Sequence, residues 1–147
     1  MRSRPIERAL AGAALALAAF AAHAGVTVTD AWARATVPGQ QASAAYMTLT
    51  SSEDAKLVAV SSPAAKSTQV HTSMMMSGVM HMHEVEALEL PAGRPVELKP
   101  GGHHVMLMGL AKPLEPGGQV ALRLTIRDAK GRSSTLDVKA SVRPLVP

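Results

Sequence analysis

The chain has 147 residues, 47% of them hydrophobic but only 2% aromatic, and a formal charge of +4 from 15 basic and 11 acidic side chains. This length fits one domain, whose core must be filled by aliphatic side chains and methionine. Because the sequence contains no cysteine, it excludes disulfides, thiol nucleophiles, cysteine zinc sites, iron–sulfur clusters and blue-copper electron transfer. The basic residues are scattered without stacking aromatics, so we expect no binding to nucleic acid.

Residues 1–24 have the features of a secretory signal peptide. Three arginines lie within the first eight residues, and residues 9–22 form an apolar run too short to span a bilayer stably. A small-x-small motif ends at Ala24, so we expect cleavage there, export to the periplasm and a mature chain without a stable membrane span. A retained N-terminal anchor is the alternative. The mature chain, from Gly25, keeps 12 basic and 10 acidic side chains.

The rest of the chain alternates short β-rich runs with Gly and Pro turns, every ~8–12 residues, as in β-sandwiches and barrels. Nine strands are predicted, at residues 26–36, 42–50, 56–61, 66–75, 79–87, 95–99, 103–110, 119–127 and 132–142. No amphipathic helix, internal repeat or second domain is evident after residue 24. We therefore expect an all-β single domain, residues 25–147, with Trp32, Met47 and Met108 in its core.

Residues 71–108 hold five of the six histidines and seven of the nine methionines. In the predicted strand 103–110, alternation places His104, Met106 and Met108 on one face and His103 on the other. One imidazole and one thioether on the same strand face could bind a single ion. These soft, neutral ligands suit Cu(I) better than Zn(II), and do not suit Mg(II) or Ca(II).

A second pair of ligands comes from the strands on either side of Gly78. His71 precedes this predicted turn and Met82 follows it, so a hairpin could bring the two side chains together. Two histidines and two methionines would then surround the ion. Thioethers need no deprotonation and avoid the oxidation to which thiolates are prone.

His81 and His83 flank Met82 and share the opposite strand face. With the methionines at 74–76, and Met75 in particular, they could form a second, weaker site that favours Cu(II) through its imidazoles. Alternatively, they are solvent-facing histidines on an exposed edge. Because residues 74–76 are consecutive methionines, they cannot all face inward.

The spacing H-x10-M-x21-H-x-M, which starts at His71, resembles the pattern of the PCu(A)C family of periplasmic copper chaperones. Flanking segments are similar too: V-T-D-A-W-A-R-A-T, A-A-Y-M-T-L, V-M-H-M-H-E-V and V-E-L-K-P-G-G-H-H-V-M-L-M-G-L. The resemblance covers nearly the whole mature domain. By position, it implies one set of metal ligands: His71, Met82, His104 and Met106.

The resemblance also implies a cupredoxin-like Greek-key β-sandwich that binds one Cu(I) near its surface. Such proteins supply copper for the copper-A centre of cytochrome c oxidase, so the implied partners are the copper-A subunit and a Sco-type copper chaperone. Some relatives carry a His/Met-rich C-terminal tail that binds further copper. Residues 142–147 contain neither residue type, so we expect no such site here.

We therefore expect a periplasmic Cu(I) metallochaperone without enzymatic activity. The same ligands would serve a storage or resistance protein that sequesters copper, and this alternative stays open. A copper-dependent oxygenase of the histidine-brace type would need an N-terminal histidine. Cleavage before His23 would create one, but it would place Phe20 where signal peptidase requires a small residue.

Overall fold

The computed structural model describes residues 25–144, so the predicted signal peptide and its cleavage site lie outside the described residues. These residues form ten β-strands: β1 Val26–Arg34, β2 Ala42–Ser51, β3 Ala55–Ser61, β4 Ala65–Met76, β5 Val79–Glu84, β6 Leu88–Leu90, β7 Val96–Leu98, β8 His103–Leu110, β9 Gln119–Asp128 and β10 Ser133–Arg143. Within this part of the chain, no helix has the length and hydrophobicity needed to cross a membrane.

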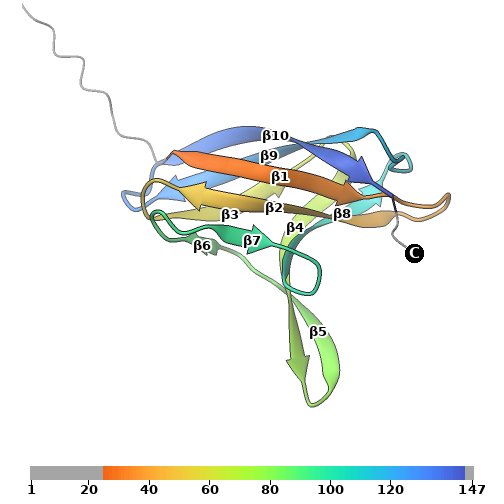
Figure 1. Cartoon of the computed structure of the whole chain (residues 1–147), viewed down its shortest axis with the longest axis horizontal. Coiled ribbons are helices and arrows are strands. Elements are labelled where there is room, and N and C mark those ends of the chain that lie inside the picture. The colour runs from red at the N-terminus through yellow and green to blue at the C-terminus, as the bar shows by residue number, and fades with distance from the viewer. Residues whose placement is uncertain (1–24, 145–147) are drawn as a thin grey trace, which may run out of the picture.

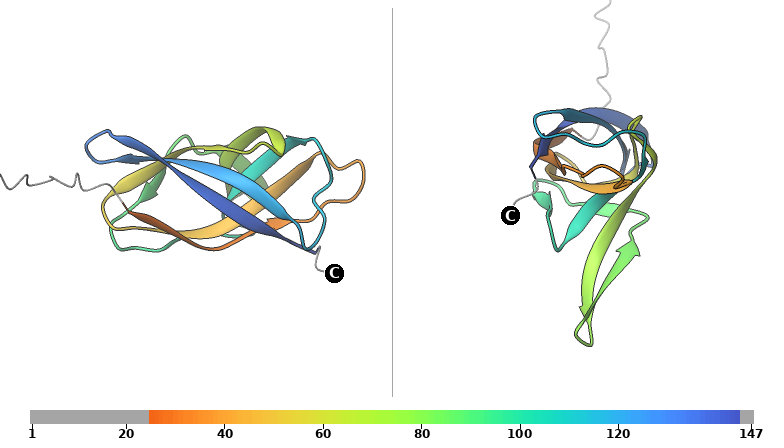
Figure 2. Two further views of the ribbon diagram at one scale, coloured as in Figure 1. Left: turned by 90° about the horizontal axis from the view of Figure 1, so that it is seen from above. Right: turned by 90° about the vertical axis from the view of Figure 1, so that its right-hand side faces the viewer.

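The strands form one mixed sheet in the order β5-β4-β8-β2-β1-β10-β9-β3-β6, with β7 paired to β2. The β1–β10 pair is parallel, and the other strand pairs are antiparallel. The sheet curls over itself, so its inner face encloses a single aliphatic core (Figures 1 and 2). The prediction of an all-β single domain is confirmed.

Several strand ends differ from the prediction by one or two residues, and one strand, β6, was not predicted. The expected strand 79–87 ends at Glu84, and Leu88–Leu90 forms a separate strand that pairs with β3. Leu88 and Leu90 alternate with one polar residue, and both are buried. Burial of two leucine side chains is worth about 3–6 kcal/mol. This gain accounts for the chain ending its pairing with β4 at Glu84 and crossing to the opposite edge of the sheet.

Met47 is buried in the core as predicted, whereas Trp32 and Met108 are only half-buried and face outward. A β-bulge, with Asp30 at a φ of 51°, shifts the register between Thr29 and Trp32. The bulge reverses the alternation of β1, so Ala31 and Ala33 pack inward and Trp32 turns out. Met108 faces outward because its neighbour Leu107 fills the core.

The hairpin of β4 and β5 projects beyond the body of the domain (Figures 1 and 2). Its two-residue turn is Ser77-Gly78, with φ of 51° and 79°, between the paired residues Met76 and Val79. Positive φ at both positions is the type I′ geometry that suits a tight hairpin. Every residue of β5 is exposed, and within residues 25–144 β5 pairs with β4 alone. The body of the domain therefore holds the hairpin through β4.

Candidate metal centre

The register of β5, β4 and β8 brings the four predicted ligands onto one face of the sheet. His71 lies directly opposite His104, and two residues along the same strands Gln69 lies opposite Met106. On the other side of β4, Ser73 lies opposite Met82. Directly paired residues share a face, and so do alternate residues of one strand. The structure therefore places on this face His71, Met82, His104 and Met106.

A row of rings crosses the sheet through these histidines. The His71 and His104 ring centroids are 5.9 Å apart with an interplanar angle of 64°. The Tyr46 ring lies 6.5 Å from that of His104, and the Trp32 ring lies 4.5 Å from that of Tyr46. These aromatic rings pack against the His104 side of the site and restrict the movement of that imidazole.

Hydrogen bonds select one free nitrogen on each imidazole. The Nδ1 of His104 lies 2.9 Å from the carbonyl oxygen of Gly102, to which it donates, so its Nε2 is left free to bind a metal. The Nε2 of His71 lies 2.9 Å from Oε1 of Gln69. If that nitrogen donates to Gln69, the lone pair of His71 is on Nδ1, which is buried and has no hydrogen-bond partner among the described residues.

Buried nitrogens without a partner are costly, since about nine in ten buried polar groups are satisfied. A bound metal ion would satisfy the His71 nitrogen. Burial, with a smaller effect from neighbouring His104, also lowers the pKa of His71, although Glu84 opposes the shift. This ring is therefore neutral at physiological pH, which is the form that binds metals.

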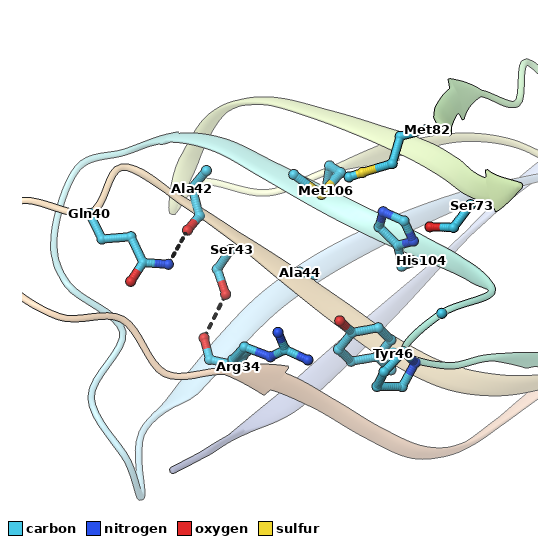
Figure 3. Close-up of a pocket in the computed structure, with 12 residues that line it drawn as sticks. Arg34, Gln40, Ala42, Ser43, Ala44, Tyr46, Ser73, Met82, His104 and Met106 are labelled. Atoms are coloured by element: carbon cyan, nitrogen blue, oxygen red, sulfur yellow. Dashed lines mark hydrogen bonds between the residues drawn. The ribbon is translucent and has the colours of Figure 1, made fainter. Parts of the chain in front are cut away.

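The two methionine side chains line an open cavity. The side chains of Met82 and Met106 extend toward each other beside His104, at a cavity of about 310 Å³ (Figure 3). His104 is 5% exposed, whereas Met82 is 52% exposed. The predicted ligands thus range from a buried imidazole on the body to an exposed thioether on the projecting hairpin.

Three side chains near the candidate ligands were not predicted from the sequence: Gln69 contacts His71, and Arg34 and Tyr46 line the cavity. Gln69 orients His71, and the Arg34 guanidinium lies 5.8 Å from the centre of the Tyr46 ring at the edge of the cavity. The Q-x-H spacing, which puts Gln69 on the same strand face as His71, was a usable signal. Arg34 and Tyr46 come from β1 and β2, and only the tertiary structure brings them here.

The second predicted group has a different composition in the structure. His81 and His83 lie on the opposite face of the hairpin, with their rings stacked 6.3 Å apart. Met75 was expected to join them, but it pairs with Met80 on the face of the primary site. Met74 lies directly opposite His81 instead. Among residues 25–144, no cluster of three or more His, Cys, Asp or Glu side chains could hold a metal ion.

The arrangement suits a soft, singly charged ion. Its donors are two imidazole nitrogens and two thioether sulfurs, all neutral and needing no ionisation before they bind. Sulfur donors favour Cu(I), whereas hard cations require oxygen ligands. Within the described residues, the face supplies no set of carboxylates for Mg(II) or Ca(II).

Comparisons with known proteins agree with this fold. Residues 26–142 match the family described as "Putative lipoprotein LpqE-like". A protein of Leifsonia xyli subsp. xyli (strain CTCB07), "Putative lipoprotein Lxx21020", is 36% identical over 116 residues, which cover 78% of this chain and 70% of the relative.

Similar solved structures include the following two. The CuI-DR1885 protein of Deinococcus radiodurans is 38% identical with a TM-score of 0.57, covering 77% of this chain and 74% of that one. The apo PCuAC domain of PmoF1 has a TM-score of 0.65 at 24% identity, covering 84% and 98%, and shows the shared cupredoxin-like fold. The chain therefore belongs to the LpqE-like, or PCu(A)C, family, which confirms the resemblance inferred from its sequence.

Proposed function

We propose that this protein binds one Cu(I) ion and carries it to an acceptor protein in the periplasm. The ligands are Nδ1 of His71, Nε2 of His104 and the sulfur atoms of Met82 and Met106. The observation that carries the proposal is the convergence of these four neutral donors on one face of β5, β4 and β8. The unpartnered buried nitrogen of His71 supports it further.

The relatives support copper as the metal. The solved structure of CuI-DR1885 bears Cu(I) in its name and is 38% identical to this chain. This chain carries thioether and imidazole ligands, which suit Cu(I), and it has no cysteine that could compete for the ion.

The gradient of exposure suits transfer better than permanent storage. A carrier must release its ion through a ligand exchange that a partner can start. Met82 is the ligand most open to solvent, and it lies on β5, an edge strand whose one partner among the described strands is β4. A donor atom of the acceptor would replace this sulfur first, while His104, buried and hydrogen-bonded to Gly102, would hold the ion until last.

By resemblance to the PCu(A)C family, we propose that the acceptor is the copper-A subunit of cytochrome c oxidase, with a Sco-type chaperone as a second partner. The proposed location is the periplasm, after cleavage behind Ala24. The proposed role is binding and delivery without catalysis. Mass spectrometry of the exported protein tests the cleavage site, since a mature chain beginning at Gly25 has no N-terminal histidine for an oxygenase-type copper site.

Metal transfer is the decisive experiment. The Cu(I)-loaded protein is mixed with the apo copper-A subunit, the two are separated, and copper is measured in each. We expect copper to move to the subunit. If copper instead stays on the carrier at equilibrium, with and without the Sco-type protein, the delivery proposal is wrong and sequestration for storage or resistance explains the site.

A further inference from the structure

The hairpin arm presents a second group of ligands on the face opposite the proposed Cu(I) site. In the pairing of β4 with β5, His83 lies opposite Thr72 and His81 lies opposite Met74. The ligands Met82 and His71 alternate with these residues and point to the other side of the ribbon. The two sets of side chains therefore cannot share one ion, because the backbone of the hairpin separates them.

The two imidazoles are already arranged side by side. The His81 and His83 rings are stacked with centroids 6.3 Å apart and an interplanar angle of 18°. Both side chains are exposed, and within residues 25–144 neither takes part in a hydrogen bond or an ion pair. Rotation of exposed side chains costs little, so both rings can turn one nitrogen toward a common ion about 2.0 Å from each.

The surroundings do not repel a cation. The face of the arm that carries these histidines has no Lys or Arg: its residues are Thr72, Met74, Met76, Val79, His81 and His83. Met74, directly opposite His81, offers a thioether at the side of the pair. Because the arm projects into solvent, water can complete the coordination.

From this juxtaposition, we propose that His81 and His83 form a second, exchangeable metal site that binds Cu(II), with Met74 as a weak third ligand. Imidazole nitrogens with water suit Cu(II), which binds nitrogen sites more tightly than the other divalent first-row ions do. The primary site, with its two sulfur donors, suits Cu(I). One hairpin would thus carry sites for the two oxidation states on its two faces.

The test distinguishes binding at the two sites by filling the primary site with a redox-inert metal. The protein is first loaded with Ag(I), a soft ion that can occupy the primary site without reducing Cu(II). One equivalent of Cu(II) is then added, and its electron paramagnetic resonance spectrum is recorded. We expect a mononuclear Cu(II) signal with hyperfine splitting from two nitrogens, and broadening of the His81 and His83 ring signals in the proton NMR spectrum.

Two variants decide the assignment. The double variant His81→Gln/His83→Gln should lose the two-nitrogen signal but still bind one Ag(I), which shows that it is folded. The matched control His103→Gln removes the imidazole that lies across β4 from His83, and it should keep the signal.

The proposal is overturned if the double variant keeps the two-nitrogen signal, which would place Cu(II) elsewhere, for example at the amino terminus. It is also overturned if wild type shows no such signal, or if His103→Gln alone abolishes it. The result is independent of the proposed Cu(I) function. Failure of the protein to take up Ag(I), with the two-nitrogen signal present, would count against the primary site alone.

Discussion

His71 and His104 lie side by side, but different groups hold them. His104 is buried, packs near Tyr46 and donates to a backbone carbonyl, so its orientation is set by the body of the domain. His71 depends on the Gln69 side chain and carries a buried nitrogen without a hydrogen-bond partner among the described residues. At the scale of single residues, the site therefore combines two differently held imidazoles. The backbone anchors His104, whereas the Gln69 side chain, which mutation can remove, orients His71.

His104→Ala and Met106→Ala should each abolish tight Cu(I) binding in a competition titration with a Cu(I) chelator. Each removes a donor atom, so we expect a loss larger than the about 10- to 100-fold seen when only an outer-shell partner is removed. His103→Ala, a change on the other face of β8, should keep wild-type affinity. Unchanged affinity in both ligand variants would refute the site assignment.

Gln69→Leu should weaken Cu(I) binding by about 10- to 100-fold without unfolding the protein. The hydrogen bond from the His71 Nε2 is lost, and the ring no longer favours the tautomer that leaves Nδ1 free. Gln69→Glu keeps an oxygen acceptor and should restore most of the affinity. If both variants bind Cu(I) equally weakly, the side chain acts through packing rather than through this bond.

The affinity for Cu(I) should depend on pH with a known sign. Burial lowers the pKa of His71 below the ordinary value of 6.5. The ring therefore stays neutral, and able to bind, to a lower pH than an exposed histidine would. We expect affinity to be flat from about pH 8 to about pH 6.5 and to fall only below that, as measured by chelator competition at each pH. A steep fall in affinity at pH values above 6.5, the ordinary pKa of histidine, would contradict the assignment of His71.

At the scale of elements, the β4–β5 hairpin connects the fold to the site. The β4 strand carries His71 within the sheet body, and β5 returns with Met82 after the Ser77-Gly78 turn. The same turn sets which residues face each other, so a register slip of one residue would move Met82 to the face now held by His81 and His83.

Gly78→Ala should weaken Cu(I) binding by roughly 5- to 30-fold. The residue has a φ of 79° with no atom near its missing side chain, so the cost is backbone strain of about 1–2 kcal/mol. Amide hydrogen exchange should speed up in β4 and β5 alone. The matched control is Gly131→Ala, with a φ of 80° in the β9–β10 turn, which should leave Cu(I) affinity unchanged. Equal effects of the two variants on affinity would show that the hairpin has no special part in binding.

At the scale of the whole molecule, the site joins strands that are far apart in the sequence but adjacent in one sheet. Binding would link the projecting arm to the body through a single ion, so it should stabilise the folded state. The stabilisation is available only to the folded protein, because the ligands are spread over 36 residues of chain from His71 to Met106.

Free Cu(I) at 100 times its dissociation constant should add about 2.7 kcal/mol to the free energy of unfolding. For a domain of this size, that raises the Tm by on the order of 10 °C. Thermal unfolding followed by circular dichroism under anaerobic conditions measures the shift. Mg(II) should produce none, and His104→Ala should reduce the Cu(I) shift. An equal shift with Mg(II) would mean that the stabilisation is not specific to soft ions.

The sequence alone determined which residue types form this site and on which strand faces they lie. Alternation is a local property, so the strand faces of the four predicted ligands, nearly all the strands and the all-β class could be predicted from the chain. The consecutive methionines at 74–76 likewise had to include an exposed side chain, and all three are exposed.

Only the tertiary structure decided the features that depend on pairing. The bulge after Thr29 turned Trp32 outward. Leu107, rather than Met108, is buried in the core. The register of β4 with β5 placed Met74, rather than Met75, beside His81. Strand alternation repeats every two residues, so one inserted residue or one step of register reverses every face beyond it. Such shifts are set by contacts between distant segments, and no local pattern in this chain records them.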